Sequence, residues 1–289
     1  MLRSITLAIP FLCGACTVVS LLPAGAPEPV AEIPIEIRYG LPTVDVYIAG
    51  ERFALFLDLG GHRALALTPE ELSRARVRFV GAASQSRNSF GEILQSRQFV
   101  ADNVMLGDFP LGTVDGGESI FGSAAPPDRN GYIGMPILGR YLLVTDYPAK
   151  RVRLYKSGDR AALERECGTR TFSVALVNGI AQSTGSTEFG ERLFLWDTGA
   201  TNNTIRPSAL PVDKRTGRRI DDGPPVVSIN TLRLGEYDIG PQLFRVTPFA
   251  APPVDAYLGA DLFASRKVCL DIPRGVGAIA NTASRPAPS

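Results

Sequence analysis

Histidine and cysteine are scarce in this sequence. Among 289 residues there is one histidine, His62, and of the four cysteines only Cys167 and Cys269 lie outside the apolar N-terminal segment. Zinc sites draw three or four ligands mainly from these residue types, so we expect no metal site, and nothing indicates another cofactor. A Ser-His-Asp triad would have to use His62, four positions after Asp58 within one turn, so we expect a turn residue there instead.

Charge of one sign is not in excess. The chain has 30 Lys and Arg against 29 Asp and Glu, a formal net charge of +1, and no run of basic residues. Proteins that bind nucleic acids concentrate cations to neutralise phosphates, so we expect no nucleic-acid partner. The charged stretch 213–222 mixes both signs and is typical of a solvated loop.

A long apolar run occurs only at the start of the chain. Arg3 is followed by an almost wholly apolar stretch at 5–22, which is typical of an export signal. Three interpretations remain open: a signal peptide cleaved after Ala-Gly-Ala at 24–26, a bacterial lipoprotein signal with a lipid anchor at Cys16, or an uncleaved membrane anchor. We assign residues 1–26 to such a signal and expect a periplasmic or secreted protein.

Short strands dominate the remaining chain. Residues 27–32 carry Pro and Glu and are interpreted as a linker. Residues 43–48 alternate in polarity, 53–57 form an apolar run, and further short runs are broken by Gly and Pro, which predicts a mainly β fold. The polar stretch 79–99 indicates a long hairpin, either projecting from the sheet or lying on the surface.

Two of the apolar runs end in an acid that is followed two positions later by glycine. One is Leu-Phe-Leu-Trp-Asp-Thr-Gly at 193–199 and the other is Leu-Phe-Leu-Asp-Leu-Gly at 55–60, and Gly-Glu-Arg precedes both. Each run predicts a buried strand, and its glycine allows a tight turn after the acid. A carboxylate delivered into a partly buried place is costly without a partner, so we expect these two acids to have a chemical role.

The similarity of the two segments extends downstream. Tyr-Ile-Gly at 132–134 corresponds to Tyr-Leu-Gly at 257–259, and in each copy an acid, Asp146 or Asp271, follows the glycine after 12 positions. The chain is therefore predicted to be a duplicated unit. Its parts are a first lobe at 33–156, a connector at 157–167, a second lobe at 168–281 and a small-residue tail at 282–289 that we expect to be disordered.

These motifs resemble the bilobal aspartic peptidases, the pepsin-like and retropepsin-like family, in a bacterial form. Leu195-Trp196-Asp197-Thr198-Gly199 matches the family's apolar-apolar-Asp-Thr-Gly motif, and Phe56-Leu57-Asp58-Leu59-Gly60 is its second copy. The segments ending in Gly259 and Gly134 match the apolar-apolar-Gly segments that accompany these motifs. The resemblance implies two similar closed β-barrel-like lobes, the acid-protease fold, with a central cleft.

The resemblance also implies a mechanism. Asp58 and Asp197 would be a catalytic dyad that shares one proton and activates water to hydrolyse a peptide bond. Gly60 and Gly199 would offer backbone N–H groups to the carboxylates, and the Thr198 hydroxyl would brace the pair across the lobes. Both acids lie in one chain, so we expect a monomer that acts on peptide or protein substrates.

One position departs from the family pattern. Leu59 stands where the family has Thr or Ser, which removes half of the hydroxyl brace but no reacting group. Either Leu59 packs instead and the chain is an active endopeptidase, or it marks an inactive pseudo-protease that binds extended peptides. A third hypothesis is a structural envelope protein that keeps only the fold.

Two further features are expected at the edges of this site. In the family a hairpin of the first lobe covers the cleft, and Phe90 and Gly91 lie at the corresponding place in the order of elements, as a flap that meets substrate. Cys167 and Cys269 lie near the two ends of the second lobe. In an oxidising compartment they would form a disulfide, and the alternative is a pair of buried free thiols.

Overall fold

The computed structural model describes residues 27–87, 92–119, 130–219, 222–250 and 253–281. The expected signal at 1–26 with Cys16, the flap residues Phe90 and Gly91, and the expected disordered tail at 282–289 lie outside these residues. Within the described part, no helix is both long and apolar enough to cross a membrane.

The first half of the chain forms an eight-stranded sheet with the strand order β2-β3-β4-β9-β5-β8-β7-β6. Two short helices, α1 (Pro69–Arg74) and α2 (Met135–Leu138), follow β5 and β9. The strands are β2 (Glu36–Arg38), β3 (Leu41–Ile48), β4 (Glu51–Asp58), β5 (Leu65–Leu67), β6 (Val77–Arg87), β7 (Ile93–Leu106), β8 (Phe109–Glu118) and β9 (Gly131–Gly134).

The second half forms a nine-stranded sheet, ordered β17-β20-β16-β21-β15-β14-β18-β19, with β13 paired to β14. Its helix α4 (Ala260–Phe263) follows β21, and 3-10 turns lie at Pro207–Ala209, Val212–Lys214 and Ile272–Arg274. The strands are β13 (Ala175–Val177), β14 (Ile180–Thr187), β15 (Gly190–Trp196), β16 (Thr204–Ile205), β17 (Val226–Ile229), β18 (Leu232–Leu234), β19 (Tyr237–Asp238), β20 (Gln242–Val246) and β21 (Ala256–Leu258).

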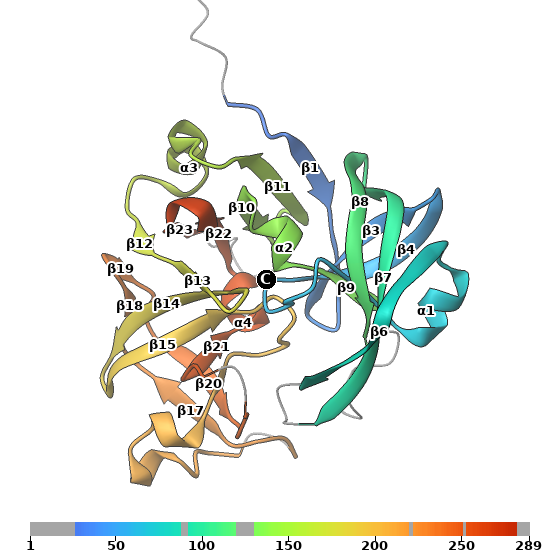
Figure 1. Cartoon of the computed structure of the whole chain (residues 1–289). Coiled ribbons are helices and arrows are strands. Elements are labelled where there is room, and N and C mark those ends of the chain that lie inside the picture. Colours follow the sequence, from blue (N-terminus) through green and yellow to red (C-terminus); the bar gives the residue numbers. More distant parts are fainter. Residues whose placement is uncertain (1–26, 88–91, 120–129, 220–221, 251–252, 282–289) are drawn as a thin grey trace, which may run out of the picture.

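A third sheet of six strands joins the halves, in the order β1-β11-β10-β22-β23-β12 (Figure 1). At its centre β10 of the first half pairs with β22 of the second, from Leu142 opposite Asp271 to Asp146 opposite Lys267. The six strands are β1 (Ala31–Pro34), β10 (Tyr141–Asp146), β11 (Arg151–Lys156), β12 (Phe172–Ser173), β22 (Arg266–Asp271) and β23 (Val276–Asn281).

This shared sheet corrects the boundary of the expected linker. Ala31 and Glu32, which we assigned to a linker at 27–32, begin β1 and pair with Leu154 and Arg153. The strand forms because Ile33 is buried against the core while Glu32 reaches Arg153 on the outer side. Prolines around this segment mask the strand pattern in the sequence.

The predicted connector contains a helix, and the polar stretch contributes to a strand hairpin. Helix α3 (Arg160–Cys167) lies within the predicted connector, and the Asp159 carboxylate caps it by accepting from Ala162 N–H at 2.9 Å. Strands β6 and β7 form a long antiparallel hairpin in the first half (Figure 1). Residues 213–219 of the charged stretch are exposed, as expected for a solvated segment.

One apolar core cluster runs through both halves. It includes Leu57 and Leu59 from the first half and Trp196 and Leu258 from the second, all of them fully buried. The halves therefore share side-chain packing as well as a sheet, and the ends of β4 and β15 are held where the halves meet.

Candidate active site

Asp58 ends strand β4. The preceding Leu55, Phe56 and Leu57 are buried because both faces of β4 are covered: Leu55 and Leu57 belong to the main core cluster, and Phe56 packs in a second cluster that includes Tyr132. Its partner β9 runs parallel and places Gly134 opposite Asp58. The chain then turns sharply, with Gly61 N–H donating to the Asp58 carbonyl at 3.1 Å. The Asp58 side chain is left half-buried at the tip of the strand.

Asp197 follows β15 in the same way. Strand β15 runs parallel to β21, and Asp197 N–H donates to the Leu258 carbonyl at 3.0 Å. Trp196, directly before the acid, is fully buried, and its Nε1 donates to Ser183 Oγ at 3.0 Å. The repeat seen in the sequence is therefore a structural repeat, in which each acid-bearing strand lies beside its own glycine-ended companion.

Each of the two carboxylates packs against the glycine of the other half. A Cβ placed on Gly60 would lie 2.7 Å from Cγ of Asp197, and one placed on Gly199 would lie 2.6 Å from Cγ of Asp58. Gly60 N–H also donates to Asp58 Oδ1 at 2.9 Å, and Gly199 N–H to Asp197 Oδ1 at 2.8 Å. The structure thus brings together the two acids and two glycines that the sequence singled out.

Thr198 braces this junction from one side. Its hydroxyl donates to the Leu57 carbonyl at 2.6 Å and accepts from Leu59 N–H at 2.9 Å, and both Thr198 and Leu59 are fully buried. The leucine side chain belongs to the main core cluster. Leu59 therefore contributes packing to a brace in which the threonine supplies both side-chain hydrogen bonds.

The companion glycines leave room for the turns beneath the acids. A Cβ on Gly134 would lie 2.2 Å from the Arg63 carbonyl oxygen, and one on Gly259 would lie 2.4 Å from that of Asn202. The two halves repeat this contact because Arg63 and Asn202 each stand five positions after their acid. A larger residue at either glycine would push the acid-bearing turn out of place.

Tyr147 is a buried residue near Asp58 and Asp197 that the sequence did not reveal. It follows β10, stacks on Phe263 with ring centroids 5.5 Å apart, and its hydroxyl has no hydrogen-bond partner within the described residues. Burial raises the pKa of Tyr147 well above its ordinary value, and the charges of Asp197 and Asp58 raise it further. The corresponding residue of the second copy is Ile272. This difference between the two copies was the one feature of the sequence that could have indicated Tyr147.

His62 lies on the turn after Asp58 and is exposed. Partial desolvation by the surrounding protein and the neighbouring Arg63 charge lower the pKa of His62, against an opposing effect of Asp58. The turn at Gly179 of the second half approaches it, since a Cβ there would lie 3.9 Å from His62 Cβ. Across the described residues, no three His, Cys, Asp or Glu side chains are grouped as metal ligands would be.

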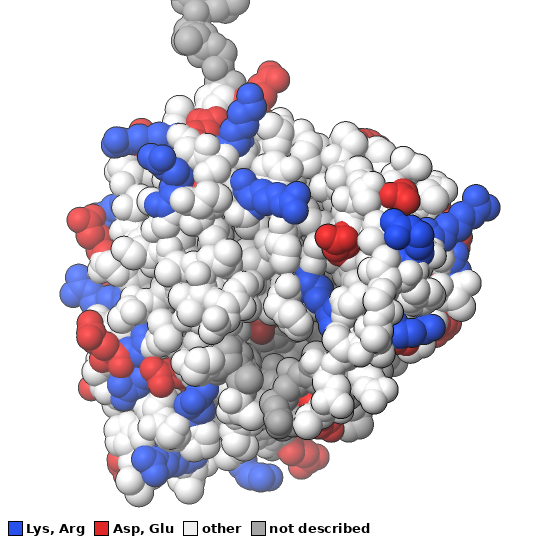
Figure 2. All heavy atoms as spheres, viewed as in Figure 1, with Lys and Arg blue, Asp and Glu red and all other residues white. Residues whose placement is uncertain are grey.

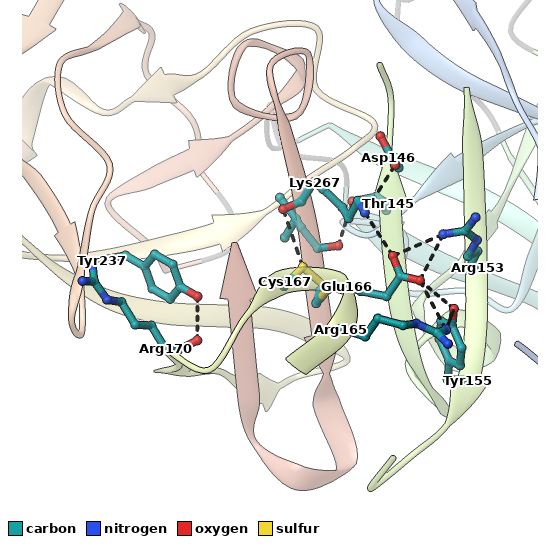
Figure 3. Close-up of a disulfide and its surroundings, with 12 residues drawn as sticks. Thr145, Asp146, Arg153, Tyr155, Arg165, Glu166, Cys167, Arg170, Tyr237 and Lys267 are labelled. Atoms are coloured by element: carbon teal, nitrogen blue, oxygen red, sulfur yellow. Dashed lines mark hydrogen bonds and ion pairs between the residues drawn. A yellow bond between two sulfur atoms is a disulfide. The ribbon is translucent and has the colours of Figure 1, made fainter. Parts of the chain in front are cut away.

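The two cysteines form a disulfide that lies apart from the acids. Cys167 at the end of α3 is bonded to Cys269 in β22, with Cα atoms 6.3 Å apart (Figure 3). Beside it the buried Glu166 accepts from Tyr155 Oη at 2.7 Å and from Lys267 Nζ at 3.0 Å. The disulfide and this cluster fasten the connector helix to the shared sheet.

The surface between the halves is hollowed on the face shown in Figure 2. Basic and acidic groups are scattered over this face and do not gather in a patch of one sign. The expected flap residues Phe90 and Gly91 lie outside the described residues, while the strands that lead toward them, β6 and β7, pair as far as Arg87 opposite Ile93.

No protein-family model and no curated protein matches this sequence. Two solved structures are similar. Basic 7S globulin from soybean is 12% identical over 87% of this chain and 95% of its own, and the aspartic proteinase from Irpex lacteus is 13% identical over 89% and 98%; each has a TM-score of 0.57. Identities this low establish the fold alone. The predicted mainly β, two-lobed acid-protease fold is confirmed.

Proposed function

We propose that this protein is an aspartic endopeptidase in which Asp58 and Asp197 activate a water molecule to hydrolyse peptide bonds. The observation that carries the proposal is the crossed packing of each carboxylate against the other half's glycine. The strands that end in the two acids, β4 and β15, lie far apart in the sequence. The packing of each acid against the other half's glycine therefore exists only when the two halves are assembled. A hydrolase of this class is also consistent with the fold shared with an aspartic proteinase.

The geometry explains how the pair would work. Two half-buried carboxylates held close together share one proton, because ionising both places like charges side by side. The pair then titrates as a unit. Its ionised member takes a proton from water while its protonated member donates to the substrate carbonyl. The Gly60 and Gly199 N–H groups each donate to Oδ1 of the acid in their own half, which fixes the orientation of both carboxylates.

The brace supports activity despite Leu59. Thr198 ties Leu57 and Leu59 of the first half to the second, so the two acid-bearing turns cannot separate without breaking two buried hydrogen bonds. Since Leu59 is fully buried, the missing hydroxyl leaves no open space. We therefore favour the active enzyme over a decayed one.

The test is cleavage of a peptide library from about pH 3 to 8, a span that brackets a shared-proton carboxylate pair. We expect cleavage by the natural chain and a loss of at least about 100-fold in Asp58→Asn and Asp197→Asn, since each removes an acid–base group. Asp213→Asn makes the same charge change at an exposed side chain and is expected to have no effect. Cleavage that survives in either dyad variant would show that another site is responsible.

The second candidate function is a pseudo-protease that binds extended peptides, and Leu59 is the observation that favours it. A folded natural chain that binds library peptides without cutting them at any pH would support this function. Absence of both binding and cleavage would favour a structural protein of the cell envelope.

We further propose that the chain is exported and acts as a monomer in the periplasm or outside the cell. The proposal rests on the apolar segment at 5–22 and on both acids being in one chain. Mass spectrometry of the mature protein would distinguish cleavage after residue 26, lipid attachment at Cys16, and an uncleaved anchor.

A further inference from the structure

The geometry points to a pocket beside the Asp58 turn that binds an acidic side chain of the substrate, with Arg63 as the residue that determines this specificity. This inference rests on the proposed function, because it names the class of peptide that the same site would take. The pocket has a volume of about 360 Å³, and its lining includes Arg63, Gln98, Leu111, Asp115, Arg140 and Tyr141.

Arg63 packs against strand β8 at a point where the strand has two glycines and therefore no side chains. Its Nη1 donates to Gln98 Oε1 at 2.7 Å, and a Cβ placed on Gly117 of β8 would lie only 1.8 Å from the same nitrogen. Gly116 is similarly confined, since a Cβ there would lie 2.3 Å from the Phe99 ring. The guanidinium therefore occupies room that only glycine in β8 leaves open.

The partner of this guanidinium is a neutral amide. Other arginines of the first half are paired with acids, such as Arg74 with Glu71 and Arg97 with Glu118. Within the described residues, no ion pair involves Arg63. Because a guanidinium has five N–H donors in a planar fork that matches a carboxylate, Arg63 keeps donors that a carboxylate in the pocket could use.

The charge of the lining also favours an anion. Arg63 and Arg140 contribute two positive charges to the lining, against one negative charge from the exposed Asp115. Leu111 and Tyr141 supply apolar surface against which the methylene groups of a glutamate would pack. The pocket therefore combines a cationic end with apolar walls, which suits a carboxylate carried on a short aliphatic stem.

The pocket is fixed relative to Asp58. Arg63 lies five positions after the acid on a turn whose carbonyls are bonded to the β9–α2 segment, Gly61 to Met135 N–H at 2.9 Å and Ala64 to Gly134 N–H at 3.1 Å. The second half approaches the same turn at His62. We infer that a peptide lying across the junction passes this pocket on one side of its scissile bond.

The second half does not repeat this pocket. The position equivalent to Arg63 is Asn202, whose Oδ1 accepts from Arg245 Nε at 3.0 Å. Arg245 lies in strand β20, which pairs with β16. In the first half the equivalent strand is β8, which pairs with β5, and the residue equivalent to Arg245 is Gly116. The two halves therefore differ in the element that supplies the guanidinium. We expect the acidic preference at the substrate position that faces Arg63.

The experiment compares peptide pairs that differ only by Glu or Gln at one position, scanned across the cleavage site, with the full chain as enzyme. We expect the Glu peptide to be cut at least about 10-fold more efficiently at one position, the usual effect of a charge-assisted hydrogen bond. Arg63→Gln should reduce this ratio to about 1, and Arg63→Lys should keep part of it because the charge remains. Arg78→Gln, an exposed arginine on β6, should leave the ratio as it is.

A binding arm separates failure of this inference from failure of the proposed function. Fluorescence anisotropy measures the same Glu and Gln peptides on Asp197→Asn, with and without Arg63→Gln, at pH 7. A Glu preference in binding that Arg63→Gln removes supports the inference even if the natural chain cuts nothing. Cleavage with no Glu preference, a preference that persists in Arg63→Gln and Arg63→Lys alike, or no binding of either peptide would overturn it.

Discussion

At the scale of single residues, Leu59 is where the two copies of the acid motif differ in chemistry. Thr198 makes two hydrogen bonds across the junction, whereas Leu59 has no hydroxyl to return them. We predict that Leu59→Thr will be more stable than Leu59→Val by about 0.5–1.5 kcal/mol, because the two variants have the same shape and only threonine can hydrogen-bond. Urea unfolding of both variants measures the difference.

Both variants should be less stable than the natural chain by about 1 kcal/mol or more, since each removes volume from a fully buried leucine. Thr201→Val, at an exposed position in the same loop, is the control for the hydroxyl change and should lie within about 0.5 kcal/mol of the natural chain. If Leu59→Thr is no more stable than Leu59→Val, the introduced hydroxyl finds no hydrogen-bond partner across the junction. The two hydrogen bonds of Thr198 would then be all that the junction can form.

At the scale of one element, the connector helix α3 depends on the ionised Glu166. Burial raises the pKa of this carboxyl, but hydrogen bonds from Tyr155 and Lys267 and the nearby positive charges outweigh burial, so the pKa is lower than usual. We predict that Glu166→Gln will lower the free energy of unfolding by about 2 kcal/mol at pH 7, because buried hydrogen bonds to a charged group are lost. Urea unfolding at a series of pH values measures it.

The pH dependence has a definite sign. A carboxyl whose pKa is lowered by folding stabilises the folded state above its ordinary pKa, and that contribution disappears as the pH falls through the folded pKa. The gap between the natural chain and Glu166→Gln should therefore be full at pH 7 and shrink below about pH 4.5. Glu164→Gln on the same helix removes only an exposed pair with Arg160 and should cost at most about 0.5 kcal/mol. A gap independent of pH would mean that Glu166 acts through shape and not through charge.

At the scale of the whole molecule, the shared six-stranded sheet should make the two halves unfold together. Strands β10 and β22 pair over five residues each, and one core cluster contains side chains of both halves. We predict a single cooperative transition in urea. Fluorescence of Trp196, the one tryptophan of the chain, reports on the second half, and far-UV circular dichroism reports on both.

The two signals should have the same midpoint. Two transitions by circular dichroism, with the Trp196 signal following only one of them, would show that the halves are independent domains. In that case the junction that holds Asp58 beside Gly199 would be weaker than the sheet between the halves suggests.

The acid-bearing strands and their companions could be predicted because their signals are local or repeated. Leu55, Phe56 and Leu57 form an apolar run that ends in Asp58, and such a run is buried wherever other side chains pack on both faces of its sheet. The companion segments were found because the same offsets occur twice. Leu59 could be recognised as a departure from the family pattern, although its burial in the core could not be foreseen from one chain.

The shared sheet and the added site residues could not be predicted in this way. Thr145 and Val268, which bond to each other in the pairing of β10 with β22, are 123 positions apart in the chain. Neither strand carries a mark of its partner, because apolar strands pair with many others. Tyr147 and Arg63 look like ordinary turn residues in the sequence, and their roles depend on what lies across from them.

The sequence by itself determined that this chain has two strand-turn units, each with an acid and a glycine, because apolar runs and glycine turns are set by neighbours along the chain. Only the tertiary structure decided that Gly60 meets Asp197 and Gly199 meets Asp58, that the Tyr147 hydroxyl is buried near both acids, and that Arg63 lies over Gly117. These contacts arise where two sheets meet. Their geometry depends on how the whole core packs, which no local pattern encodes.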